Sequence, residues 1–139
     1  MKQKLNCILL IDDDEPTNFL NRMVIEEMDC SKRVEVMQSA KEALKYLTNT
    51  TPEGDYPRPD LVFLDINMPA MDGWEFLEKY NQLPEDQKAK IVVVMLTTSF
   101  NPEDEMKAHK IPGISGFWNK PLTPEILLSI LHKHFPDNF

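Results

Sequence analysis

Residues 61–73 read LVFLDINMPAMDG, an apolar run that ends in Asp65 and gives way to a polar segment rich in turn-forming residues. The pattern predicts a buried strand with a carboxylate at its carboxyl end. In an open α/β sheet, ligands bind outside the carboxyl ends of the strands, so a charge there is better explained by chemistry than by packing. Residues 6–15, NCILLIDDDE, repeat the pattern. We therefore expect two strand ends to share one acidic pocket.

Short apolar runs alternate five times with helical patterns along the chain. Strands are expected at residues 5–11, 33–37, 60–65, 90–97 and 114–119. The run IVVVML at 91–96 is apolar without alternation, which is typical of a parallel strand buried on both faces. At 139 residues, the chain has room for one domain. These features predict an α/β fold, a doubly wound parallel sheet of five strands, in a single domain over residues 1–139.

Between the expected strands, apolar residues recur at helical spacing. They form four stripes that we expect to pack against the sheet: Phe19, Leu20, Met23, Val24 and Met28; Ala40, Ala43, Leu44 and Leu47; Phe76, Leu77 and Tyr80; and Leu127, Ile130, Leu131 and His134. Ser39 and Glu42 form a capping-box pattern at the start of the second helix. A further helix, at 101–109, has only Met106 and Ala108 to bury. It is therefore expected to be weakly anchored and easily displaced, unless it is simply a solvated surface helix.

The composition limits the classes of partner. The net charge of −8, from 15 basic and 23 acidic residues, argues against direct binding to nucleic acid or to an anionic membrane, because phosphate binding draws on clustered Lys and Arg. Proteins are the expected partners. No apolar stretch approaches the roughly 20 residues that span a bilayer, and there is no signal-type cleavage site, so a cytoplasmic chain is expected. Cys7 and Cys30 fit no zinc or redox motif and are expected to be reduced, structural thiols.

The expected strand ends bring Asp12, Asp13 and Asp65 into one crevice. Three carboxylates repel one another strongly at low dielectric and therefore require a cation. Oxygen-only ligands favour Mg²⁺, Ca²⁺ or Mn²⁺ over zinc, and a few carboxylates completed by water suit Mg²⁺. The alternative is a set of solvated acids that cap helices, a reading that suits Asp14 and Glu15.

Two further side chains are expected at the same rim. The fourth strand ends at Thr97, and the fifth runs into Lys120. A hydroxyl can hydrogen-bond a phosphoryl oxygen, and an ammonium that faces a carboxylate and a phosphoryl group can neutralise developing charge. Each residue alone is weak evidence, since a strand-end Thr is usually a cap and a Lys is usually solvated. Their coincidence with the acids points to phosphoryl chemistry.

With these residues in place, the chain resembles the receiver domain of two-component response regulators over essentially its whole length. The family's motif residues correspond to these positions: the paired acids Asp12 and Asp13, the phospho-accepting Asp65, the switch hydroxyl Thr97, the switch aromatic Phe117 and the lysine Lys120, which precedes Pro121. The loop at 65–73 also follows the family pattern closely.

The resemblance implies how such a site works. A sensor histidine kinase or a phosphotransfer protein would phosphorylate Asp65, with Lys120 and Thr97 assisting the transfer. The groups that would hold Mg²⁺ are the side chains of Asp13 and Asp65 and the main-chain carbonyl of Asn67, with Asp12 acting through a water. No catalysis beyond the chain's own phosphorylation and dephosphorylation is expected.

The resemblance also implies a flavodoxin-like (βα)5 fold with strand order 2-1-3-4-5 and a cis bond between Lys120 and Pro121. Phosphorylation would draw Thr97 toward the phosphoryl group and let Phe117 turn inward. The surface that would change is formed by residues 101–110, 114–119 and 123–135. A downstream protein target, or a second copy in a homodimer, would read that change.

Two other readings remain. A haloacid-dehalogenase-type phosphatase also forms an aspartyl phosphate with Mg²⁺, but it needs a second Asp two residues after the nucleophile, and Asn67 stands two residues after Asp65. Asp12 and Asp14 fit that spacing, but the Thr or Val expected two residues later is replaced by Pro16. The other reading is a degenerate receiver that binds partners without phosphorylation, which is disfavoured because every signature position is filled.

Overall fold

The computed structural model describes the chain except for residues 1–3, 51, 53, 55–56, 58, 67, 85–91, 98–101 and 111–113, and it describes residues 92, 93 and 97 by their backbone alone. Strands and helices alternate along the described residues. In chain order they are β1 (Ile8–Ile11), α1 (Glu15–Met28), β2 (Val34–Met37), α2 (Ala40–Thr48), β3 (Leu61–Asp65), α3 (Gly73–Asn81), β4 (Val92–Thr97), α4 (Pro102–Lys110), β5 (Gly116–Asn119) and α5 (Pro124–His134). Residues 90, 91 and 101 of the predicted elements lie outside the described part.

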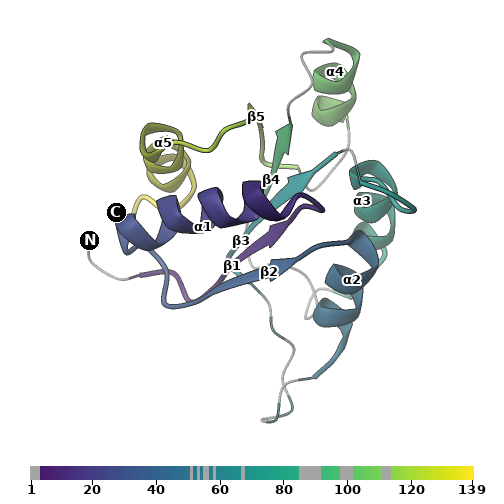
Figure 1. Ribbon diagram of the computed structural model, residues 1–139, viewed down its shortest axis with the longest axis horizontal. Helices are drawn as coiled ribbons and strands as arrows, with labels where there is room; N and C mark the ends of the chain where they lie inside the picture. The colour runs from purple at the N-terminus through teal and green to yellow at the C-terminus, as the bar shows by residue number, and fades with distance from the viewer. Residues whose placement is uncertain are drawn as a thin grey trace.

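The strands form one parallel sheet in the order β2-β1-β3-β4-β5, which confirms the predicted order (Figure 1). α1 and α5 cover one face of the sheet, and α2 and α3 cover the other. In the register, Ile11 of β1 stands beside Leu64 of β3, and Asp65 stands beside Leu96 of β4. Because all strands run the same way, their carboxyl ends meet at one edge of the sheet.

The sheet is buried on both faces, so that every residue of β1 and β3 is buried. Leu10 and Phe63 belong to the core under α1 and α5. Ile11, Leu64 and Phe76 belong to the core under α2 and α3. Burial on both faces explains why these strands read as apolar runs without alternation.

Side-chain caps fix where four helices begin. The capping residues are Asp14 for α1, Ser39 for α2, Asp72 for α3 and Thr123 for α5. The Ser39 hydroxyl accepts a hydrogen bond from the Glu42 N–H at 3.0 Å, and the Glu42 carboxylate accepts one from the Gln38 N–H at 3.1 Å. The predicted capping box is therefore confirmed, although the reciprocal bond reaches the residue before the cap.

The predicted apolar face of α1 is wrong in part. Three of its five residues lie in solvent, with exposed fractions of 63% for Phe19, 56% for Leu20 and 42% for Met23. Val24 and Met28 pack partly against the core, as expected. The fully buried positions are Asn18, Asn21 and Ile25, which also recur at helical spacing. α1 is turned this way because the Asn18 side chain hydrogen-bonds the main chain at the end of β1.

The other apolar stripes are confirmed. Their buried members are Ala40, Ala43, Leu47, Phe76, Leu77, Tyr80, Leu127, Ile130 and Leu131, while Leu44 and His134 are half-buried. In α4 only Ala108 is buried, and the expected burial of Met106 is wrong because that side chain is exposed. The Lys107 ammonium lies 4.7 Å from the ring centroid of Trp74, a cation–π contact between α4 and α3. α4 is thinly packed, as predicted.

Two further expectations concern the whole chain. Cys7 and Cys30 are buried free thiols, as predicted. Burial raises the pKa of the Cys30 thiol to about 11. No helix in the described part of the chain is both long and apolar enough to cross a membrane.

Candidate functional site

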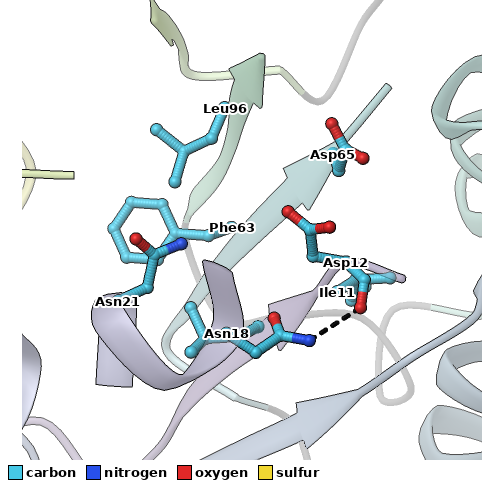
Figure 2. A pocket seen from close by; sticks show the side chains of 8 residues that line it. Ile11, Asp12, Asn18, Asn21, Phe63, Asp65 and Leu96 are labelled. Atoms are coloured by element: carbon cyan, nitrogen blue, oxygen red, sulfur yellow. Dashed lines mark hydrogen bonds between the residues drawn. The ribbon is translucent and has the colours of Figure 1, made fainter. Parts of the chain in front are cut away.

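Three carboxylates meet at the carboxyl edge of the sheet. Asp12 follows β1, Asp13 is next in the chain, and Asp65 ends β3. Carboxylate oxygens of all three lie within 4.8 Å of one another. Figure 2 shows the carboxylates of Asp12 and Asp65 close together. Asp12 and Asp65 are buried, whereas Asp13 is exposed, so the cluster opens to solvent on the side of Asp13.

A lysine reaches the same cluster from β5. Lys120 follows the last residue of that strand, and its ammonium forms ion pairs with Asp12 and, at 3.2 Å, with Asp65. Only 10% of its side chain is exposed. The bond from Lys120 to Pro121 is cis, as expected. One cation therefore bridges the two buried acids of the cluster.

Burial and charge set the protonation of this cluster. Burial raises the pKa of Asp65, the charge of Asp12 raises it further, and Lys120 opposes both effects. Burial alone would lower the pKa of Lys120, but its hydrogen bond to Asp12 and the charge of Asp65 outweigh burial, so the pKa of Lys120 lies above its ordinary value. Counted by formal charges, three carboxylates and one ammonium give the site a net charge of −2. Asp65 is thus a buried carboxylate whose negative charge is only partly balanced.

Asp12 is held at three of its oxygen atoms. One carboxylate oxygen accepts a hydrogen bond from the Asp14 N–H at 2.9 Å, and the other contacts the Lys120 ammonium. The main-chain carbonyl of Asp12 accepts a hydrogen bond from the Asn18 amide nitrogen at 2.7 Å, drawn as a dashed line in Figure 2. Our sequence reasoning missed Asn18. The recurrence of polar Asn18 and Asn21 with Ile25 at helical spacing is the signal that could have found it.

The backbone just after Asp65 is held by the start of α3. The Gly73 N–H donates to the carbonyl of Ile66 at 2.8 Å. A Cβ added to Gly73 would lie 2.6 Å from the main-chain oxygen of Asp65. The turn between them contains Ala70 with a positive φ of 68°. Glycine at position 73 therefore allows α3 to begin directly against the strand end that carries Asp65.

The other predicted site residues have different outcomes. Asn67 lies outside the described residues, and for Thr97 the structure gives only the backbone, which pairs with Asn119. Phe117 is half-buried on β5 and packs against the core under α2 and α3. Asp14 is exposed and accepts a hydrogen bond from the Thr17 N–H at 3.1 Å, so it is a helix cap, the alternative considered above.

The donor set suits a hard divalent cation. It offers only carboxylate oxygens, drawn from Asp12, Asp13 and Asp65, which matches the ligand preference of Mg²⁺ over zinc. Its residual negative charge is also of the sign and size that one divalent cation would balance. The solvent-exposed position of Asp13 leaves room for the water molecules that Mg²⁺ normally keeps.

Comparisons with known proteins agree with this arrangement. Residues 8–132 match the response regulator receiver domain family. The chain is 33% identical over 136 residues to a protein of Vibrio cholerae named a probable cyclic di-GMP phosphodiesterase, with 96% of this chain and 28% of that protein covered. It is 30% identical over 135 residues to response regulator Rcp1 of Synechocystis, with 84% and 90% covered. A two-component response regulator from Cytophaga hutchinsonii has a crystal structure with a TM-score of 0.81 at 29% identity, with 94% and 97% covered.

The share of the relative's own length that this chain spans differs between these proteins. This chain spans just over a quarter of the length of the Vibrio cholerae protein. It spans nearly all of the Cytophaga hutchinsonii regulator and most of Rcp1. The phosphodiesterase name therefore describes a protein that is mostly outside the matched region.

Proposed function

The chain belongs to the response regulator receiver domain family, and we propose on that premise that it accepts a phosphoryl group on Asp65 from a sensor histidine kinase or a phosphotransfer protein. One observation carries this proposal: the Asp65 carboxylate lies within reach of two further acids and 3.2 Å from the Lys120 ammonium. A nucleophile, a divalent-cation site and a fixed cation are the parts that phosphoryl transfer to a carboxylate requires.

The proposed roles follow from the positions of the side chains. Asp13, Asp65 and the main-chain carbonyl of Asn67 would hold Mg²⁺, with Asp12 acting through a water. Bound there, Mg²⁺ supplies positive charge that offsets the carboxylates and the phosphoryl oxygens. Lys120 already faces Asp65, so its ammonium is in position to pair with a phosphoryl oxygen.

The transfer step conserves the phosphoryl group. A carboxylate oxygen of Asp65 attacks the phosphorus of a phosphohistidine, and an O–P bond forms. The P–N bond of the donor breaks, and its electron pair stays on the imidazole nitrogen, which then takes up a proton. Thr97 ends the neighbouring strand β4, and we assign its hydroxyl the role of donating a hydrogen bond to a phosphoryl oxygen.

The exposed apolar face of α1 supports a docking place for the phosphoryl donor. Leu20 borders a hollow of about 240 Å³ together with Lys120 and Pro121, so it lies next to the acid cluster. Phe19 and Met23 extend the apolar surface along the helix. A donor protein has to bring its phosphohistidine to Asp65, and an apolar helix face beside that residue offers it a contact surface.

The output proposed is a shift of α4, β5 and α5 after phosphorylation. In α4 only Ala108 is buried, and Lys107 contacts Trp74, so moving the helix disrupts little apolar packing. Phe117 lies on β5 beside α4, where it lines a shared hollow with Ala108. A downstream protein, or a second copy of the chain, would read the shift. The proposal covers residues 1–139 as one receiver domain acting in the cytoplasm.

The first test is the intact mass of the protein after treatment with acetyl phosphate and Mg²⁺. We expect one added phosphoryl group that hydroxylamine removes, as it removes an acyl phosphate. Asp65→Asn should gain none, and excess chelator should prevent the gain in the wild type. A comparable hydroxylamine-labile group on Asp65→Asn would refute the assignment of Asp65.

The second test separates docking from chemistry. Leu20→Ser should slow transfer from a cognate histidine kinase but leave phosphorylation by acetyl phosphate unchanged, because a small donor needs no docking surface. Met106→Ser is the matched control, since Met106 is equally exposed but lies on α4. Equal rates for Leu20→Ser and wild type with the kinase would refute this docking surface.

A further inference from the structure

Asn18 is a buried polar residue that the proposed chemistry does not use. It lies in the second turn of α1 and is 4% exposed. Its amide nitrogen donates to the main-chain carbonyl of Asp12 at 2.7 Å. Its amide oxygen is buried and, among the described residues, has no hydrogen-bond partner. A buried acceptor without a partner is unusual in a folded protein.

The orientation of the Asn18 amide follows from its one hydrogen bond. If the amide were rotated by half a turn, two oxygen acceptors would face each other at about the distance of that bond, which is repulsive. The nitrogen therefore faces Asp12, and the oxygen points away from it. Figure 2 shows this oxygen turned away from the hydrogen bond.

Asn18 lines a hollow that Asp12 and Asp65 of the acid cluster also line. The hollow measures about 10 Å³, and Asn18, Asn21, Asp12 and Asp65 line it on the polar side, with Phe63 among the apolar residues (Figure 2). That volume is about the least that accommodates one water molecule. Buried waters typically make about three hydrogen bonds to buried polar groups, and four polar side chains border this hollow.

We propose that the hollow binds one structural water on the amide oxygen of Asn18, and that Asn18 is a positioning residue that holds the β1–α1 turn carrying Asp12 and Asp13. The nitrogen of one amide fixes the main chain of Asp12, and its oxygen is fixed in turn by the water. This inference deepens the function proposed above and rests on it in one respect, that the acid cluster binds Mg²⁺. Through Asn18, a movement of α1 would also move the main chain of Asp12 in the acid cluster.

The test compares two substitutions on the same buried face. Asn18→Leu keeps a similar volume but removes both hydrogen bonds, and Asn21→Leu alters the same hollow without touching the bond to Asp12. Asn18→Leu should weaken Mg²⁺ binding about tenfold or more, the usual effect of losing a group that orients metal ligands. Asn21→Leu keeps the bond from Asn18 to Asp12, so it should weaken Mg²⁺ binding much less than Asn18→Leu does. Mg²⁺ affinity is measured by calorimetric titration, and thermal unfolding is recorded for each variant.

The melts separate positioning from general destabilisation. Asn18→Leu leaves the main-chain carbonyl of Asp12 without its partner, so it should unfold at a lower temperature than wild type. Mg²⁺ is therefore titrated well below that temperature, where the variant is still folded and its Mg²⁺ affinity should nevertheless fall. Asn18→Ser, with a hydroxyl that reaches Asp12 only through a second water, should show an intermediate Mg²⁺ affinity. It is the second variant if Asn18→Leu does not fold.

The presence of the water can be tested separately by NMR. A long-lived water should give cross-peaks to the side-chain amide protons of Asn18 in the wild type, and these should vanish in Asn21→Leu if Leu fills the hollow. Wild-type Mg²⁺ affinity in Asn18→Leu, equal losses in both Leu variants, or a dry hollow in a high-resolution crystal structure would each overturn the inference. If the wild type binds no Mg²⁺, the proposed function fails, and the water measurement still decides whether Asn18 holds a water.

Discussion

Replacing Gly73 by Ala tests whether the contact between α3 and the end of β3 positions the site. The added Cβ would lie 2.6 Å from the main-chain oxygen of Asp65 and 2.9 Å from the Cα of Ile66. Ordinary contacts begin at 3.4 Å, so the shorter distance falls about 0.8 Å below them. Both neighbouring atoms belong to the backbone, so neither can move aside as a side chain would. The start of α3 and the strand end must separate.

The expected magnitude combines two opposing effects. Alanine inside a helix gains about 0.5–1 kcal/mol over glycine. Overpacking of this kind costs about 1–3 kcal/mol. Because the clash is with backbone, we take the upper part of that range and expect a net loss of about 1–2 kcal/mol. For a chain of this length, each kcal/mol lowers the melting temperature by roughly 3–4 °C.

The assay is urea unfolding followed by circular dichroism, with Mg²⁺ titrations on the same samples. Gly116→Ala is the matched control, because its new Cβ would meet side-chain atoms, Trp118 Nε1 at 3.3 Å and Val94 Cγ2 at 3.6 Å, which can yield. It should change stability by no more than about 0.5 kcal/mol. Gly73→Ala should also weaken Mg²⁺ binding, because its clash moves Asp65. A Gly73→Ala protein as stable as wild type would refute the reasoning.

Three further predictions concern charge and burial. Asp65→Asn should be more stable than wild type near neutral pH without Mg²⁺, because burial and Asp12 raise the pKa of Asp65 and make its ionised form unfavourable in the fold. The advantage should shrink as the pH falls through that raised pKa toward 3.8, where wild-type Asp65 becomes neutral too, and thermal melts that show it widening on acidification would contradict this. Lys120→Met should cost about 3–5 kcal/mol in urea unfolding, because it leaves two buried carboxylates without their shared cation, and added Mg²⁺ should restore part of the loss. A Lys120→Met protein equal to wild type in both conditions would exclude that role. Cys7 and Cys30 should react with a thiol reagent only after denaturant is added, since both are buried and the pKa of Cys30 is raised to about 11; labelling of the native chain at neutral pH would count against this.

The strands and the acid cluster could be predicted because their causes are local in sequence. A strand buried on both faces must be apolar throughout, and a charge at its end is visible at once in Asp12 and Asp65. The face of α1 could not be predicted in the same way. Periodicity weighs apolar residues, and it favoured Phe19 and Leu20 over Asn18, whose burial depends on a hydrogen bond to the main chain at the end of β1. That bond exists only once the sheet and helix have come together.

For α4, the sequence predicted how little of the helix is buried but not which residue is buried. Its sequence showed correctly that little of it could be buried, but Met106 is exposed while Ala108 is buried. In a helix with one buried position, the residue that faces the sheet depends on how the helix sits against the sheet and on tertiary contacts such as that of Lys107 with Trp74. A sequence window of nine residues carries little information about either.

The charged residues of the pocket are also synthesised in a fixed order, with the acids before the lysine. Lys120 follows Asp65 by 55 residues, so a ribosome adding about 5–20 residues per second completes the three acids roughly 3–11 s before it supplies their cation. During that interval, pairing of β1 with β3 would bring the three carboxylates together before the Lys120 ammonium is present to offset their charge. Repulsion between these carboxylates opposes closing of the sheet until Lys120 has been added. A codon change that slows translation between positions 65 and 120 should lengthen the time for which newly made chains are open to proteases and chaperones, without altering a single residue of the finished protein.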